Sequence, residues 1–194
     1  MIDWTILDKH YRKDRMSMQE IALTLGCSLH KVMYYMEKYD IPRRTRSEAA
    51  YQKHHPNGDP FGIIPVKTID QAKLMGLGLG LYWGEGNKAN RYSVRLGNTD
   101  PELLNLFIEF LVQLFGVNRD DLRFGLQLFS DVNSQEALGF WTQKLGARAS
   151  QFYKITVTIS GSIGTYRKKN KYGVVTVYYH NKKLRDILVG MLPR

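Results

Sequence analysis

The sequence predicts an α+β fold, in which helices cover one face of an antiparallel sheet, joined to a small all-α helix-turn-helix domain. Apolar residues recur at helical spacing through the first 46 residues. Beyond residue 70, such segments are interspersed with runs of apolar–polar alternation, which are typical of strands. Turn-forming residues separate the two regions: Pro56, Asn57, Gly58, Asp59 and Pro60. We therefore expect a helix-turn-helix domain over residues 1–46, a linker over 47–69 and a larger domain over 70–194.

The composition favours nucleic acid as the partner. The 194 residues carry a formal net charge of +10 and 12 tyrosines, which indicates affinity for nucleic acid or an anionic membrane surface. The longest apolar run, Leu74–Gly84, is too short to span a membrane, and the N-terminus lacks a signal-peptide pattern. The single cysteine, Cys27, cannot form an intrachain disulfide, which fits a reducing compartment. We therefore expect a cytoplasmic protein that binds nucleic acid and no membrane.

The N-terminal region has the pattern of three short helices. Residues 2–13 form the first expected helix. Ser17 to Glu20 is a capping box that begins a second helix, which ends at Gly26. Ser28 can cap a third helix that runs to about residue 39. The apolar side of the first helix is expected to carry Trp4, Leu7 and Tyr11. Two helices joined by a short turn with glycine resemble the helix-turn-helix of many bacterial DNA-binding proteins.

The third helix would be the recognition helix that enters the major groove of double-stranded DNA. Its candidate DNA contacts lie away from its apolar face: Ser28, His30, Lys31 and Tyr34. The alternative is that these residues form the solvated face of a three-helix bundle.

Three arginines follow the third helix. Pro42 ends that helix, and Arg43, Arg44 and Arg46 then lie in a segment expected to be extended. Such an arm suits contact with phosphates or the minor groove. A solvated charge run is the alternative interpretation.

The most unusual segment is the apolar helix expected from Asp70, a possible N-cap, to Gly86. Gly76, Gly80 and Gly84 repeat every four residues, so they form one ridge where another helix can approach closely. Each interior glycine costs about 1 kcal/mol relative to alanine, and close packing of a second helix would offset that cost. The helix ends on Glu85, where the helix dipole disfavours a carboxylate, and this placement suggests a metal ligand.

The string Gly80-Leu81-Tyr82-Trp83-Gly84-Glu85-Gly86 resembles the LAGLIDADG motif of homing endonucleases. Trp83 departs from the motif, and Glu85 stands where the family usually has aspartate. The resemblance extends over about residues 70–192. It implies that two motif helices pack side by side across a subunit axis at the glycine ridge. It also implies that the acid at the foot of each helix binds the divalent metal, Mg²⁺, that cuts DNA.

The remaining elements of the larger domain follow from periodicity and capping. Strands are expected over residues 92–97, 122–129, 151–160 and 172–179, and helices from about Pro101 to Gly116, from Ser134 to Leu145 and after Asn181. In the second strand, Arg123, Gly125 and Gln127 face away from the apolar side. The expected result is a sheet with one polar, basic face, which can lie along DNA. The alternative is that this face is only the solvent-exposed side of an ordinary two-layer domain.

A basic loop between two of these strands is a further candidate for backbone contact with DNA. It contains Arg167, Lys168 and Lys169 beside a tyrosine.

These patterns support one leading hypothesis and two alternatives. The leading hypothesis is a homodimeric homing-type endonuclease, in which Glu85 of each subunit binds Mg²⁺ for phosphodiester hydrolysis. Gln127 and Lys154 are further candidates to position water or phosphate. The first alternative is a transcriptional regulator that keeps the fold without cutting, since Trp83 and the lone carboxylate leave this open. The second is an RNA-binding or intron-splicing module.

Overall fold

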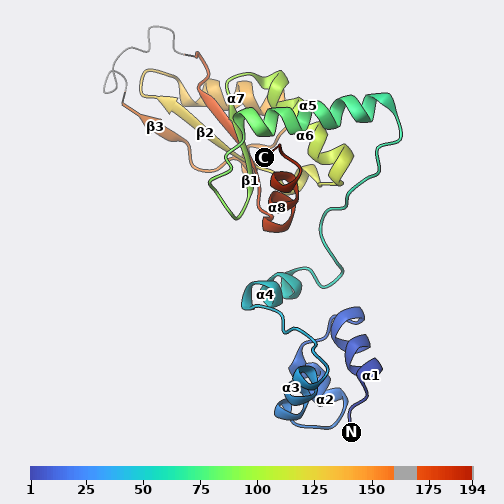
Figure 1. Ribbon diagram of the computed structural model, residues 1–194. Coiled ribbons are helices and arrows are strands. Elements are labelled where there is room, and N and C mark those ends of the chain that lie inside the picture. Colours follow the sequence, from blue (N-terminus) through green and yellow to red (C-terminus); the bar gives the residue numbers. More distant parts are fainter. Residues whose placement is uncertain (160–169, 194) are drawn as a thin grey trace. The chain divides into compact units, whose positions relative to one another are not determined.

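The chain divides into two compact units, Met1–Asp59 and Pro60–Arg194, in a computed structural model that describes residues 1–159 and 170–193 (Figure 1). The division falls within the segment expected to be a linker. Residues 47–59 belong to the first unit, and the main chain of residues 60–69 is tied to the second. Gly62 and Ile64 donate backbone hydrogen bonds of 2.9 Å to Phe115 and Leu114.

The first unit is a helical bundle. Its elements are α1 (Trp4–Asp8), the π-helical turn η1 (Lys9–Lys13), α2 (Met18–Thr24), α3 (Leu29–Lys38) and α4 (Arg46–His54). The capping box at α2 is confirmed, because Ser17 Oγ accepts from the Glu20 N–H and the Glu20 carboxylate accepts from the Ser17 N–H. Gly26 takes φ +57° in the turn between α2 and α3. The expected burial of Trp4 is wrong: its side chain is 47 % exposed, and Ile2 occupies the core position at that end.

The second unit is an α+β domain. Its helices are α5 (Ile69–Glu85), α6 (Pro101–Phe115), α7 (Ser134–Leu145) and α8 (Lys182–Gly190), with short 3₁₀ turns η2 (Arg119–Asp121) and η3 (Ala149–Gln151). Its strands are β1 (Val94–Asn98), β2 (Arg123–Phe129), β3 (Thr156–Thr158) and β4 (Val174–Tyr179). They form one sheet in the order β1-β4-β2-β3. One core joins the helices of this unit to alternate strand residues, and among the described residues of the unit no helix covers the other face of the sheet (Figure 1).

The sheet differs from the expected all-antiparallel arrangement. The β1–β4 and β4–β2 pairs are antiparallel, but β3 pairs with β2 in parallel, so the sheet is mixed. The alternation in β2 is confirmed, since Phe124, Leu126 and Leu128 are all buried. Antiparallel sheets can leave one face to solvent, and this mixed sheet does the same.

The strand expected over 151–160 is wrong for most of its length. Phe152 pairs with Phe124, whereas Thr156 pairs with Gln127. The chain therefore advances four residues from Phe152 to Thr156 while β2 advances three residues. That extra residue is a bulge, and it interrupts the strand before β3 begins. Alternation in the sequence cannot reveal such a bulge, because each side of it keeps its own regular period.

Helix α5 begins two residues earlier than expected, and it is less buried. Thr68 caps it in place of Asp70, in a capping box with Gln71. Although the helix is apolar nearly all round, only Gly78 and Tyr82 are buried. One side of α5 therefore faces solvent in a single copy of the chain.

Candidate nucleic-acid interface

The outer face of α3 is the first part of the candidate interface. His30, Lys31 and Tyr34 are exposed, with Tyr34 58 % exposed. Val32 and Met36 on the opposite side are fully buried in the first unit. The outer face of α3 is thus free for a ligand, as a recognition helix requires, and the same arrangement fits the solvated face of a helical bundle.

Ser28 has a structural role at the start of α3. Its side-chain oxygen accepts a 3.2 Å hydrogen bond from the Lys31 N–H and caps the helix. Its hydroxyl hydrogen can still be donated, so the cap does not exclude a contact with phosphate.

The three arginines do not form an extended arm. The Arg44 guanidinium lies 4.0 Å from the centre of the Tyr11 ring and donates to the backbone oxygens of Tyr11 and Met16. The Arg44 N–H donates to the Tyr11 hydroxyl at 2.7 Å. Arg44 thus holds the segment after α3 against η1. Arg43 and Arg46 remain exposed, but Arg46 is the first residue of α4 and is not in an extended segment.

The helix-free face of the sheet carries a second basic surface. Cross-strand pairing places Arg95 of β1 beside Tyr178 of β4, and Tyr178 beside Arg123 of β2. The Arg95 guanidinium lies 5.1 Å from the centre of the Tyr178 ring. Within the described residues, neither arginine forms an ion pair with a carboxylate. Both cations are therefore available to an anionic ligand.

The next row along this face is nearly flat. Gly97 of β1 and Gly125 of β2 flank Thr176 of β4. A Cβ at Gly97 would lie 2.9 Å from Thr176 Oγ1, and one at Gly125 would lie 3.0 Å from the Tyr178 ring. Larger residues would crowd these neighbours, so the glycines keep a shallow surface beside the arginines.

A tyrosine–histidine pair, which the sequence patterns did not single out, completes this surface. Tyr153 Oη and His180 Nε2 lie 2.6 Å apart, and both rings pack against Tyr178. The pKa of His180 lies below its ordinary value of 6.5, because these neighbours partly desolvate the ring and because Arg95 and Arg123 repel its charged form. The lowered pKa favours the neutral form of His180 more than in a free histidine.

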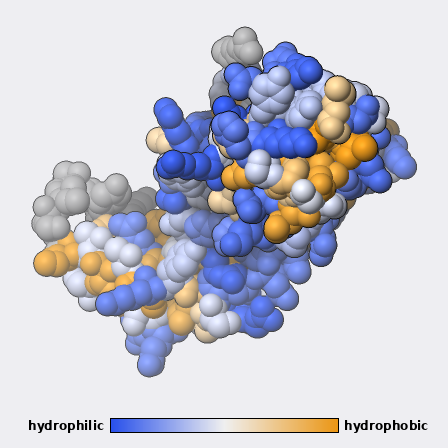
Figure 2. Space-filling view, turned by 90° about the horizontal axis from the view of Figure 1, so that it is seen from below, coloured by the Kyte–Doolittle hydropathy of each residue, from blue (hydrophilic) through white to orange (hydrophobic). Residues whose placement is uncertain are grey.

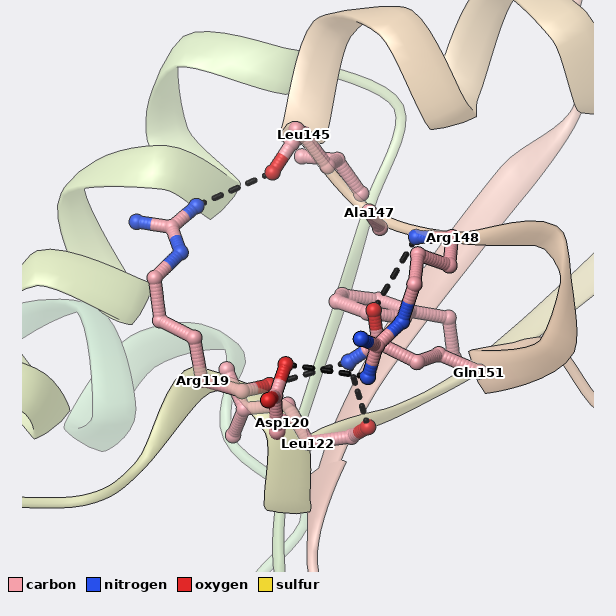
Figure 3. Close-up of a pocket in the computed structure, with 9 residues that line it drawn as sticks. Arg119, Asp120, Leu122, Leu145, Ala147, Arg148 and Gln151 are labelled. Carbon is pink, nitrogen blue, oxygen red and sulfur yellow. Dashed lines mark hydrogen bonds and ion pairs between the residues drawn. The ribbon is translucent and has the colours of Figure 1, made fainter.

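A pocket of about 270 Å³ lies beside the segment just before Tyr153, and hydrogen bonds among its lining residues hold that segment (Figure 3). Gln151 donates to the backbone oxygen of Arg119 at 2.9 Å and accepts from the Arg148 N–H at 3.0 Å. The Arg148 guanidinium forms a 3.0 Å ion pair with Asp120. These contacts hold Arg148 and Gln151 against η2, and the Tyr153 N–H then donates to the backbone oxygen of Phe124 at 2.8 Å.

The expected catalytic residues are not brought together in one copy. Glu85 is exposed at the end of α5, beside Gly86, which bridges to β1. Gln127 lies on β2, two strands from β1, and its Nε2 lies 3.4 Å from Thr158 Oγ1. Lys154 is exposed in the bulge before β3, on the far side of β2. The described residues contain no group of three acidic, histidine or cysteine side chains that could hold a metal ion.

The glycine ridge of α5 is uncovered. A Cβ at Gly76, Gly80 or Gly84 would meet no atom within 4 Å outside the helix's own backbone. The glycine that packs within the chain is Gly78, where a Cβ would lie 2.1 Å from Phe110. Large apolar side chains beside the ridge are also exposed: Ile69 (75 %), Leu77 (54 %) and Trp83 (55 %). The exposed face of α5 therefore combines a ridge of glycines with three large apolar side chains, and it also carries the Lys73–Asp70 ion pair.

Other apolar side chains are also exposed, including Leu23, Val157 and Ile159. On the side that Figure 2 shows, apolar residues form patches among hydrophilic ones. Within the described ranges, every helix is too short or too polar to cross a membrane. The basic loop residues Arg167, Lys168 and Lys169 lie outside the described residues.

Comparison with known proteins gives no match: no family model, no curated protein and no solved structure matches this chain. The function proposed below therefore rests on the residues and contacts of the chain itself.

Proposed function

We propose that this chain is a cytoplasmic, homodimeric DNA-binding protein of the LAGLIDADG homing-endonuclease type, which cuts phosphodiester bonds with a divalent metal. The observation that carries the proposal is the uncovered ridge of Gly76, Gly80 and Gly84. Interior glycines cost helix stability, and within one copy no close packing offsets this cost. A second copy of α5 laid against the ridge supplies that packing through an isologous interface.

Two surfaces support DNA as the ligand. The outer face of α3 offers His30, Lys31 and Tyr34, with Arg43 exposed nearby in the chain. The helix-free face of the sheet offers two arginines without carboxylate partners, beside a flat glycine row. Unpaired cations on an extended surface supply the electrostatic part of DNA affinity, and side chains on a recognition helix can supply base discrimination.

Glu85 is the residue that would hold the metal. Its carboxylate is exposed and forms no ion pair within the described part of the chain. One carboxylate is a poor Mg²⁺ site, but a dimer across the ridge would supply two, which suits a hard cation. Bound Mg²⁺ supplies activation of water and stabilisation of the leaving oxygen. Gln127 and Lys154 lie too far across the sheet to complete this site from the same copy.

The cleavage test uses supercoiled plasmids that carry the sequences flanking the gene. We expect the wild-type protein to nick or cut them with Mg²⁺ and to bind without cutting in the presence of EDTA. Glu85→Gln should keep the dimer and the DNA affinity but lose cutting, because an amide is a poor Mg²⁺ ligand. Equal cutting by wild type and Glu85→Gln would exclude Glu85 as the metal ligand.

A transcriptional regulator that binds without cutting is the second candidate. It is favoured by the last turn of α5, where the Lys88 ammonium donates to the backbone oxygen of Trp83, so a cation of the chain itself already occupies this helix end. Sequence-specific binding of the wild-type protein without cutting in Mg²⁺ or Mn²⁺ would support the regulator, and stronger binding to structured RNA than to DNA would contradict both candidates.

A further inference from the structure

The helix-free face of the sheet concentrates hydrogen-bond donors at one place. Arg95 and Arg123 flank Tyr178 from the two neighbouring strands, and His180 follows β4 directly. The Tyr178 and His180 rings are nearly parallel, with centroids 6.0 Å apart. Guanidinium groups carry donors and no acceptors, so the cluster favours a ligand that is rich in acceptors.

Each arginine is held in place by neutral groups. Arg95 Nε donates to Ser93 Oγ at 2.7 Å, and Ser93 is fully buried. Arg123 Nη1 donates to the backbone oxygens of Asp120 and Leu122 at 2.7 and 2.8 Å. These contacts fix both side chains without neutralising their charge, and each guanidinium retains donors that bind no group among the described residues.

The contact between Tyr153 and His180 bears on which nitrogen of His180 carries the proton. A neutral imidazole has one N–H, so Nδ1 carries the hydrogen when the Tyr153 hydroxyl donates to Nε2 across the 2.6 Å contact. No residue in the described ranges accepts from Nδ1, and His180 is exposed, so this N–H is free for a ligand.

We propose that Arg95, Arg123 and the Nδ1–H of His180 form a binding subsite for one backbone phosphate of the nucleic acid, with Tyr153 as the positioning residue. The two guanidinium groups supply charge, and the histidine supplies a directed donor. Phosphate is favoured over a base edge because the cluster carries two unpaired positive charges and presents donors. This inference rests on the proposed nucleic-acid function and specifies how the sheet takes part in it.

The first test measures the histidine tautomer in the full chain by two-bond ¹H–¹⁵N NMR at pH 7.5. The chain has five histidines, and a His180→Phe variant assigns the signal of interest. We expect His180 to be in the Nδ1–H form and to become a mixture of tautomers in Tyr153→Phe, which keeps the ring. A His180 signal in the Nε2–H form in the wild type would overturn the proposal.

The second test titrates the same sample with inorganic phosphate and, separately, with a short DNA duplex at constant ionic strength. His180 should shift in both titrations, while His54 and His55 serve as internal controls during the phosphate titration. His180→Phe should weaken duplex binding about tenfold, the loss expected for one charge-assisted hydrogen bond. Tyr153→Phe should weaken binding several-fold without changing the thermal midpoint.

The outcomes separate this inference from the proposed function. If the duplex shifts His30 on α3 and leaves His180 unmoved, DNA binding stands and the phosphate subsite is wrong. If no duplex binds but inorganic phosphate shifts His180, the subsite stands and the DNA-binding proposal fails. If phosphate shifts no histidine and the duplex shifts only those of the first unit, the sheet has no such subsite.

Discussion

At the scale of single residues, neighbouring arginines have different roles. Arg44 stacks on Tyr11 and donates to backbone oxygens of the first unit, whereas Arg43 is exposed. The sequence could not distinguish them, because the partners of Arg44 are Tyr11 and the carbonyls near it, about 30 residues earlier in the chain. Local charge patterning carries no information about such distant contacts.

Replacing Arg44 should therefore lower the stability of the first unit, whereas replacing Arg43 should change only DNA binding. Arg44→Ala removes a cation–π contact and several hydrogen bonds, so the first unit should lose about 1–3 kcal/mol of unfolding free energy. Arg43→Ala should leave stability unchanged and reduce the salt dependence of DNA binding by about one unit of slope. Urea unfolding and binding at several salt concentrations check this pair. Loss of stability in Arg43→Ala alone would reverse the assignment.

His180 gives a prediction about pH. Its folded-state pKa lies below 6.5, so the unfolded chain binds more protons in the interval between the two values. Stability should then fall as the pH drops through 6.5 toward the folded pKa, and His180→Phe should lack this component. The charged and titratable groups that face the ring are Arg95, Arg123, Tyr153 and Tyr178.

Measuring the pKa of His180 by NMR titration tests what lowers it. Arg95→Gln should raise the pKa of His180 toward 6.5 by removing one repelling charge, and bound duplex should raise it further by adding a negative one. An unchanged pKa in Arg95→Gln would mean that Arg95 does not contribute and that desolvation and Arg123 lower the pKa.

At the scale of elements, sequence patterns within a few residues predicted individual helices and strands, but contacts between distant segments were not predictable from them. Capping residues and regular periods located α2, α6, α7 and β2 because their causes lie within a few residues. Arg95 and Tyr178 on the sheet could have been found, since both lie in alternating segments. The parallel pairing of β3, the bulge and the Tyr153–His180 contact depend on residues distant in the sequence, and no local pattern marks them.

Helix α5 provides the sharpest prediction at this scale. Gly78→Ala should destabilise the second unit, because its Cβ would lie 2.1 Å from Phe110. Gly80→Ala meets open space in one copy, so it should keep or raise monomer stability by up to about 1 kcal/mol. Thermal unfolding below the dimerisation concentration measures both. Equal destabilisation by the two variants would show that the ridge is already packed within the chain.

At the scale of the whole molecule, each unit has its own candidate surface for DNA. The first unit offers α3, and the second offers the basic face of its sheet. A homodimer would double both surfaces and give the target a two-fold symmetry, so its preferred site should be roughly palindromic. Selection of bound duplexes from a random pool should recover inverted repeats, whereas a single asymmetric motif would indicate that a monomer binds.

The most direct measurement is sedimentation equilibrium of the full chain, alone and with its DNA. The account predicts a wild-type dimer in at least the DNA-bound state. It also predicts a monomer for Gly80→Leu, with the thermal midpoint of the wild-type monomer retained, because a Cβ at position 80 meets no atom within 4 Å beyond the backbone of α5. A wild-type protein that stays monomeric in both conditions would contradict the paired-helix account and remove the basis for Glu85 as a metal ligand.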